Sequence, residues 1–305
     1  MRTGYLTAIG LFSLSTLFWS GNIIAGRIAG GEIGPLTLSF FRWAIALLVI
    51  LPFAWKSILR QRRQYLRFWW FVALLALLNV ASYNTLIYWG LNYTTAINAA
   101  VLNSAFPVAV FMLTWVSGQE KGNRYQLGGM ALAIAGVLVV AVRGNLSSFS
   151  TLSLNPGDLA ILTALLCFAL YSVILKRAPV KFNTVGLLTV QIGLGVGVLL
   201  PLYYYEYTHG ARIVWNNNMW WLFGYIGLFP SVLAHLCWLK GVELGGANLS
   251  GIMYNLIPVF AIVLAIPLLG EKLAPYHVFG VALIFTGVYF AVFHSQRRLR
   301  TAGQT

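Results

Sequence analysis

The sequence predicts an all-α polytopic membrane protein with ten transmembrane helices arranged as two inverted five-helix repeats. Three observations predict this fold class: a composition poor in charge, ten long apolar runs, and a similarity between the two halves of the chain. Apolar residues make up 59% of the 305 positions and charged residues only 9%, whereas a soluble domain uses about 25% charged residues. So few charges cannot cover the surface of the protein in water, and we therefore expect lipid to be its solvent.

Ten apolar runs of roughly 18 to 25 residues are long enough to cross the hydrocarbon core of a bilayer as helices. They cover residues 5–25, 35–55, 69–89, 96–117, 125–142, 157–175, 184–204, 219–239, 247–269 and 276–293. The runs are continuously apolar rather than alternating, which favours helices over a β-barrel. A second run follows the first at once, so we expect the first to be a retained span and not a cleaved signal peptide.

The net charge of +14 does not indicate nucleic-acid binding, because the basic residues lie between the predicted helices. If the N-terminus is cytoplasmic, the inner side holds Arg2, Lys56, Arg60, Arg62, Arg63, Arg67, Lys121, Arg124, Lys176, Arg177, Lys181, Lys240, Arg297, Arg298 and Arg300. The outer side then holds only Arg27, Arg143, Arg212 and Lys272. Because cytoplasmic loops carry the excess of positive charge, we expect a protein of the cell inner membrane with both termini in the cytoplasm.

The chain resembles itself when it is shifted by half its length. Residues 96–142 then align without a gap on residues 247–293, which places Pro107 on Pro258 and Gly136 on Gly287. We therefore expect two five-helix repeats, residues 1–145 and 146–305. Five helices are an odd number, so the second repeat must enter the membrane inverted. Inverted repeats around a central site are a recurring plan of secondary transporters, and the sequence thus predicts a carrier of a small molecule.

Several of these residues carry a resemblance to a known family. Phe18-Trp19-Ser20-Gly21 is followed by Arg27 and Phe41-Arg42, and Pro258 is followed by Gly270-Glu271-Lys272, Gly280 and Gly287, with Pro107 and Gln119-Glu120-Lys121 in the first half. This set resembles the EamA family of the drug/metabolite transporter superfamily over essentially the whole chain. The resemblance implies a ten-helix exporter of amino acids or other metabolites in the cytoplasmic membrane, and the aromatic-rich interior is similar to aromatic amino-acid exporters. Phe168 departs from the pattern, because many relatives repeat the tryptophan there.

Arg42 is the clearest polar group within a predicted span. It lies about seven residues into the second helix, roughly 10 Å along its axis, where an arginine costs about 2.5–3.5 kcal/mol to insert. Two interpretations remain open: Arg42 braces neighbouring helices, or it binds the carboxylate of a substrate.

Amides and aromatic rings share helix faces elsewhere in the spans. Interhelical hydrogen bonds would explain any one asparagine, whereas the whole set favours a wet cavity for a zwitterion with an apolar side chain. The residues that we predict to bind substrate are Trp19, Asn22, Arg42, Asn79, Tyr83, Asn98, Asn103, Tyr171, His235, Trp238, Tyr254 and Asn255. Pro107 and Pro258 each remove a backbone hydrogen bond near mid-helix, so they are either hinges or static kinks.

The mode of energy coupling is predicted from what the spans lack. Aspartate and glutamate fall near helix ends or in loops, with Asp158 and Glu206 near helix ends, whereas coupled carriers commonly use an intramembrane carboxylate. Facilitated, gradient-driven transport is therefore expected. His235 could instead titrate in the useful range, which leaves a proton-coupled exporter of drugs or other metabolites as the alternative.

Other function classes fit the sequence less well. An enzyme needs a nucleophile with a base, or a metal site, and an ion channel needs rings of charge or a carbonyl filter; neither pattern is evident in the sequence. We expect no cofactor and no metal. The partners expected are a small-molecule substrate and membrane lipid, no nucleic acid, and no second copy, because ten helices can enclose a path alone. The exact substrate stays open at this point.

Overall fold

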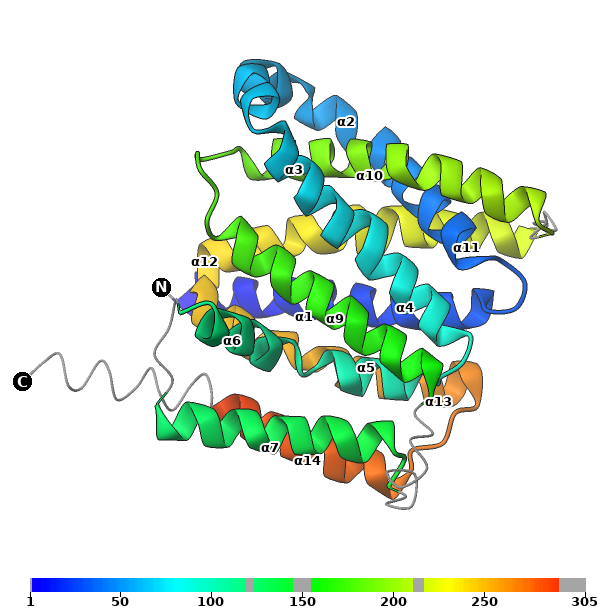
Figure 1. Ribbon diagram of the computed structural model, residues 1–305, viewed down its shortest axis with the longest axis vertical. Helices are drawn as coiled ribbons and strands as arrows, with labels where there is room; N and C mark the ends of the chain where they lie inside the picture. The colour runs from blue at the N-terminus through cyan, green and yellow to red at the C-terminus, as the bar shows by residue number, and fades with distance from the viewer. Residues whose placement is uncertain (1, 119–122, 145–154, 211–216, 291–305) are drawn as a thin grey trace, which may run out of the picture.

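A computed structural model describes residues 2–118, 123–144, 155–210 and 217–290, and the regular structure in these ranges is entirely helical (Figure 1). Nine helices within these ranges are long and apolar enough to cross a membrane, and the apolar helix Pro275–Val288 is shorter. The protein is therefore a polytopic helical membrane protein. The tenth predicted span, 276–293, ends outside the described residues. Glu120, Lys121, Arg212 and the three C-terminal arginines also lie outside them.

The helices follow the predicted spans closely. The first half contains α1 (Arg2–Ala29), α2 (Pro35–Arg67), α3 (Trp69–Ala76), η1 (Leu77–Tyr83), α4 (Asn84–Leu91), α5 (Ala96–Asn103), α6 (Phe106–Val116) and α7 (Arg124–Ala141). The second half contains α9 (Pro156–Leu175), α10 (Thr184–Thr208), α11 (Asn217–Leu228), η2 (Phe229–Leu233), α12 (Ala234–Tyr254), α13 (Leu256–Leu269) and α14 (Pro275–Val288).

Helices from the two halves pair with each other. α1 packs along α12 and α13, α2 along α10, and α7 along α14 (Figure 1). In the last pair the contacts are reciprocal, because a Cβ atom at Gly136 would lie 2.8 Å from the Gly280 carbonyl oxygen and one at Gly287 would lie 2.5 Å from that of Gly129. Small residues let helix backbones approach in this way inside a membrane.

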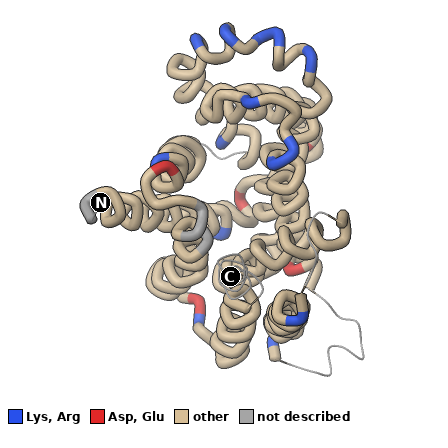
Figure 2. Tube along the Cα trace, turned by 90° about the vertical axis from the view of Figure 1, so that its left-hand side faces the viewer, with Lys and Arg blue, Asp and Glu red and all other residues tan. Residues whose placement is uncertain are grey.

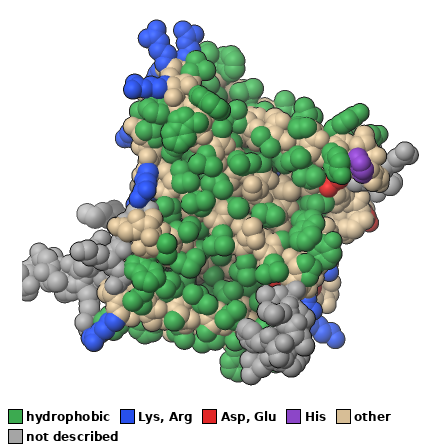
Figure 3. Space-filling view, in the orientation of Figure 1, with side chains coloured by type: hydrophobic (Ala, Val, Ile, Leu, Met, Phe, Trp, Pro, Cys, Tyr) green, Lys and Arg blue, Asp and Glu red, His purple; other side chains and the backbone are tan. Residues whose placement is uncertain are grey.

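Positive charge gathers where α2 leaves the predicted span. The span was expected to end at residue 55, but α2 continues to Arg67 and carries Lys56, Arg60, Arg62 and Arg63 on this extension. Figure 2 shows these basic residues along the helix at the top of the view, and the face seen in Figure 3 is covered mostly by hydrophobic side chains. The separation of charge from apolar surface is what a bilayer requires.

Four helical spans are interrupted near their middle. The span that contains α3 and α4 has a π-helical segment, η1, and the span that contains α11 has another, η2, which includes Pro230. α5 ends at Asn103 just before Pro107, and α12 ends at Tyr254 just before Pro258. Such interruptions free backbone carbonyls, and within a membrane these are tolerated where they are buried in protein or line a cavity.

Candidate substrate site

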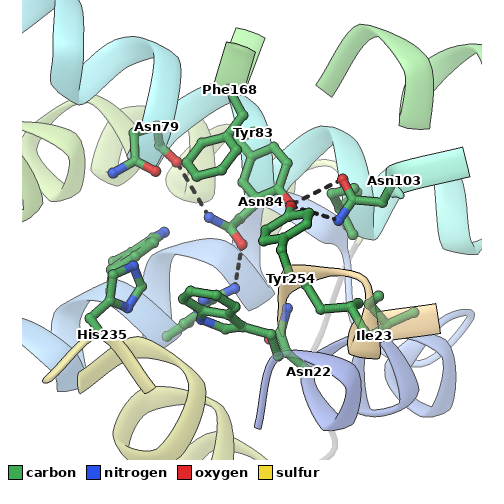
Figure 4. Close-up of a pocket in the computed structure, with 14 residues that line it drawn as sticks. Asn22, Ile23, Asn79, Tyr83, Asn84, Asn103, Phe168, His235 and Tyr254 are labelled. Carbon is green, nitrogen blue, oxygen red and sulfur yellow. Dashed lines mark hydrogen bonds between the residues drawn. The ribbon is translucent and has the colours of Figure 1, made fainter. Parts of the chain in front are cut away.

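A cavity lies among the interrupted spans, near the middle of the helix bundle. It is lined by Trp19, Asn22, Ile23, Arg42, Trp43, Asn79, Tyr83, Asn84, Ile87, Asn103, Phe168, His235, Tyr254 and Ile257 (Figure 4). Its volume is about 60 Å³, which is room for a few water molecules. Small-molecule sites usually measure about 300–1,000 Å³, so this conformation is too tight for an organic solute.

Arg42 supplies the positive charge of the cavity. Its side chain is 2% exposed, and its Nε donates to Ser231 Oγ at 2.7 Å. Nη1 donates to Asn84 Oδ1 and to the Tyr88 hydroxyl oxygen. No aspartate or glutamate of the described residues forms an ion pair with Arg42, so the guanidinium is held only by neutral groups.

Both π-helical segments support this arginine. Asn84 Nδ2 donates to the backbone carbonyl oxygen of Asn79 at 3.3 Å. The Ser231 hydroxyl donates to the backbone carbonyl oxygen of Ile226 at 2.7 Å. In each case the donor lies five positions after the acceptor, which is the spacing of a π-helical turn. The carbonyls that the π segments free therefore orient the two side chains that accept from Arg42.

The opposite side of the cavity is aromatic. Tyr83 donates its hydroxyl to Asn103 Oδ1 at 3.3 Å, and Asn103 Nδ2 lies 3.5 Å from the Tyr254 hydroxyl oxygen (Figure 4). Phe168 stacks on Tyr83 with ring centroids 4.7 Å apart. An apolar face with a few fixed polar groups opposite a cation suits a ligand with one charged end and one apolar end.

Eight of the predicted substrate residues line the cavity, namely Trp19, Asn22, Arg42, Asn79, Tyr83, Asn103, His235 and Tyr254. The other four lie outside it. Trp238 packs behind Trp19, with ring centroids 5.1 Å apart, and Tyr171 stacks on the far side of Phe168 at 5.6 Å. Asn255 follows Tyr254 at the break between α12 and α13. Asn98 belongs to a separate buried cluster with Asp158.

The two predicted hinges lie where their helices are interrupted. Pro107 is in the first turn of α6, and Pro258 is in the first turns of α13. Asn103 and Tyr254 lie at the breaks that precede these prolines, and both line the cavity. Both prolines therefore lie directly beside the candidate site, whether they act as hinges or as static kinks.

Sequence reasoning missed some contributors. Ile23, Trp43, Asn84, Ile87, Phe168 and Ile257 also line the cavity, and Tyr88 and Ser231 bind Arg42. Asn84 is not on the same face of a regular α-helix as Asn79, and only the π turn aligns them. The spacing of five positions between Asn79 and Asn84 was the signal in the sequence that could have indicated their alignment.

Comparisons with known proteins agree with this architecture. The model of the EamA-like transporter family matches residues 6–142 and again residues 155–293. The chain is 25% identical over 283 residues to the uncharacterized transporter YyaM of Bacillus subtilis, covering 90% of each chain. It is 27% identical over 285 residues, 92% of each chain, to a probable terminal-alkyne amino-acid exporter of Streptantibioticus cattleyicolor.

A solved crystal structure shares the fold. It superposes with a TM-score of 0.61 over 97% of this chain and 99% of its own, at 19% sequence identity. The family match covers nearly the whole chain in two consecutive segments, each of which contains one set of interrupted helices. The chain belongs to the EamA-like transporter family.

Proposed function

We propose that this protein exports amino acids, with aromatic or large apolar side chains favoured, or related small metabolites, by facilitated alternating access. The observation that carries the proposal is the buried guanidinium of Arg42, which has no carboxylate partner among the described residues. A buried charge without a counter-charge is costly. A substrate carboxylate would supply that charge and could form strong, charge-assisted hydrogen bonds with the guanidinium.

The aromatic side of the cavity supports the second half of this proposal. Tyr83, Phe168 and Tyr254 present ring surface opposite Arg42. A substrate whose carboxylate meets Arg42 would place its side chain against these rings. The name of the Streptantibioticus relative, a probable amino-acid exporter, is consistent with this substrate class.

We further propose that residues 1–145 and 146–305 form two inverted repeats of five spans each, with α14 as the tenth. Two observations support this. The reciprocal glycine contacts between α7 and α14 are those expected of elements related by a two-fold axis. Asn103 and Tyr254, which align in the two halves, contact each other and would lie on that axis.

The repeats also suggest which side of the membrane is open. Each interrupted span has one half near the outer side of the membrane and one half near the inner side. On the side that we assign to the outside, α5 packs against α1, α13 and α14. The corresponding inner segment is the end of α12. Within the described residues it makes no comparably extensive contact with α6, α7 or α9. We infer that this conformation is closed to the outside and opens toward the cytoplasm.

Counterflow into proteoliposomes tests the substrate class. Labelled phenylalanine should exchange, and unlabelled phenylalanine should compete far better than phenethylamine, which lacks the carboxylate. Arg42→Gln should raise the half-saturating concentration about tenfold to a hundredfold, because a hydrogen bond to a charged group contributes about 1.5–3 kcal/mol. Lys240→Gln is the matched control, since Lys240 is exposed and forms a salt bridge with Glu243 in the same helix.

Equal competition by phenethylamine and phenylalanine would make Arg42 a helix brace and would favour the cationic-drug alternative. The competition assay uses the wild-type protein, so it remains decisive even if Arg42→Gln folds poorly.

A further inference from the structure

A second buried polar cluster lies at the outer end of the bundle, apart from the cavity. It consists of Thr94 before α5, Asn98 in α5, Asp158 in the first turn of α9, and His277 in α14. Each of these four residues is 1–2% exposed. The cluster joins both halves of the chain, because Thr94 and Asn98 come from the first half and the other two residues from the second.

Asp158 is surrounded by hydrogen-bond donors. The Thr94 hydroxyl donates to its Oδ1, and Asn98 Nδ2 lies 3.4 Å from Oδ1 and 3.5 Å from Oδ2. None of the lysines or arginines in the described ranges forms an ion pair with it. Although Asp158 lies near a helix end, it is 1% exposed.

His277 fixes the orientation of Asn98. Its Nδ1 accepts a hydrogen bond from the Ala274 backbone N–H at 2.9 Å, so the ring proton is on Nε2. Nε2 lies 2.9 Å from Asn98 Oδ1 and donates to it. The amide nitrogen of Asn98 is thereby turned toward Asp158, and the chain of hydrogen bonds runs from α14 through α5 to α9.

Four further charged or titratable groups lie around the cluster. Arg143, at the end of α7, and Tyr276, beside His277, are close enough to interact electrostatically with Asp158. Glu271 accepts hydrogen bonds from the N–H groups of Ala96 and Ile97, at 2.7 and 2.9 Å, and so binds the N-terminus of α5. Arg27 Nε lies 4.0 Å from Glu271. Together these contacts hold α5 against α13 and α14.

We propose that Asp158, with Thr94 and Asn98, is a proton-binding site that holds the outer side of the transporter closed. A carboxyl group that is sealed from water and forms no ion pair within the described residues either keeps a proton or gains free energy by reaching water. With the proton bound, the carboxyl group donates to the Thr94 hydroxyl oxygen instead of accepting from it, so Asp158 stays within the cluster and α5 stays in place. After the proton leaves, the carboxylate gains free energy by reaching water, and this favours movement of α5 away from α9 and α14.

This inference rests on the proposed transport function but does not make the carrier proton-driven. The cluster is not repeated on the inner side, because the positions aligned with Asp158 and His277 in the other half are Ile9 and Gln126. A proton that binds from the outside and returns to the outside does no transport work. External pH therefore sets the rate of outward opening and leaves the final substrate distribution unchanged.

Proteoliposomes with fixed internal pH and varied external pH test the effect on rate. The wild-type exchange rate should rise by up to about tenfold per pH unit across the titration of one group, with a plateau on either side. The exchange rate of Asp158→Asn should not change with external pH and should equal the wild-type rate at low pH, because the amide mimics the neutral acid. Thr94→Val should shift the midpoint of the profile and keep its slope. Glu243→Gln, which changes an exposed carboxylate, should retain the wild-type profile.

His277→Gln tests whether the proton is bound by Asp158 or by His277. Gln126, which aligns with His277, accepts a hydrogen bond from the Asn123 backbone N–H at 2.9 Å, just as His277 does from Ala274. The variant should therefore keep the helix cap and a pH-dependent rate, with the midpoint of the profile shifted because Asn98 loses the ring that orients it toward Asp158. Loss of the profile in His277→Gln, with the profile intact in Asp158→Asn, would assign the proton to His277 and overturn the proposal.

Thermal unfolding of the purified protein without substrate separates this inference from the transport proposal. A proton bound in the folded state stabilises it at low pH, and that contribution is lost as the pH rises through the titration of Asp158. The wild-type Tm should fall over this interval, and Asp158→Asn should remove that fall. If no amino acid is exchanged but Asp158→Asn still removes the fall, the proton site stands and the transport proposal fails. Unchanged pH dependence of Tm and of rate in Asp158→Asn would overturn the proton site.

Discussion

The side-chain amide nitrogen of Asn103 lies 3.5 Å from the hydroxyl oxygen of Tyr254, a residue 151 positions further along the chain. The same spacing relates Pro107 to Pro258, and both helices are interrupted just before these prolines. Two aligned residues can meet only close to the axis that relates their segments. In the proposed inverted-repeat arrangement the contact therefore lies where the two halves move relative to each other, and both residues line the cavity.

Replacing Asn103 by leucine should slow transport more than it destabilises the protein. The substitution keeps the number and branching of the side-chain heavy atoms but removes both hydrogen bonds to Tyr83 and Tyr254, and such bonds in membrane proteins average about 0.6 kcal/mol. We expect a severalfold lower counterflow rate with little change in the detergent melting temperature. Tyr254→Phe, which removes only one hydroxyl, is the milder control. A large loss of stability with normal transport in the folded fraction would show that Asn103 is only a brace.

Adding a methyl group at Gly136 should destabilise the protein. A Cβ there would lie 2.8 Å from the Gly280 backbone oxygen, and backbone cannot move aside as a side-chain end can. Overpacking of this kind costs typically 1–3 kcal/mol. Gly128→Ala in the same helix is the matched control, because a Cβ at Gly128 has no neighbour within 4 Å. Equal melting temperatures for the two variants would contradict the close packing of α7 on α14.

The proposed topology predicts the location of two reporters. A fusion at the C-terminus should report cytoplasm, and one near residue 148 should report the external side, because basic residues concentrate on the inner side. Alkaline phosphatase and a fluorescent protein, fused at each position, measure the two sides. Both positions on the same side would exclude five spans in the second half.

Facilitated transport predicts that ion gradients cannot concentrate the substrate. Imposed pH or sodium gradients should change the rate of exchange at most, while a substrate gradient should drive it. His235 lines the cavity beside Trp19, with ring centroids 5.5 Å apart, and is the titratable group that could couple protons there. His235→Gln should therefore leave gradient-driven flux measurable. Uphill accumulation that follows a proton gradient and disappears in this variant would make the protein a coupled carrier.

The sequence by itself determined the membrane environment, the helix positions and the family. These depend on the length of apolar runs and on residue identities at fixed spacing, which are local properties of the chain. Arg42 was also identifiable, because an arginine within an apolar run is expensive in any arrangement of helices.

Only the tertiary structure decided which polar residues share a site. Asn98 and Asn103 lie in the same short helix, but five positions apart in α5 they face different neighbours, Asp158 and Tyr254. Asn84 reaches Arg42 because η1 inserts a π turn, which was not predicted from its sequence. Asp158 is near a helix end, yet it is 1% exposed and Asn98 of α5 lies against it. Depth along a helix axis can be counted from the sequence, whereas burial around the axis depends on which other helices pack there.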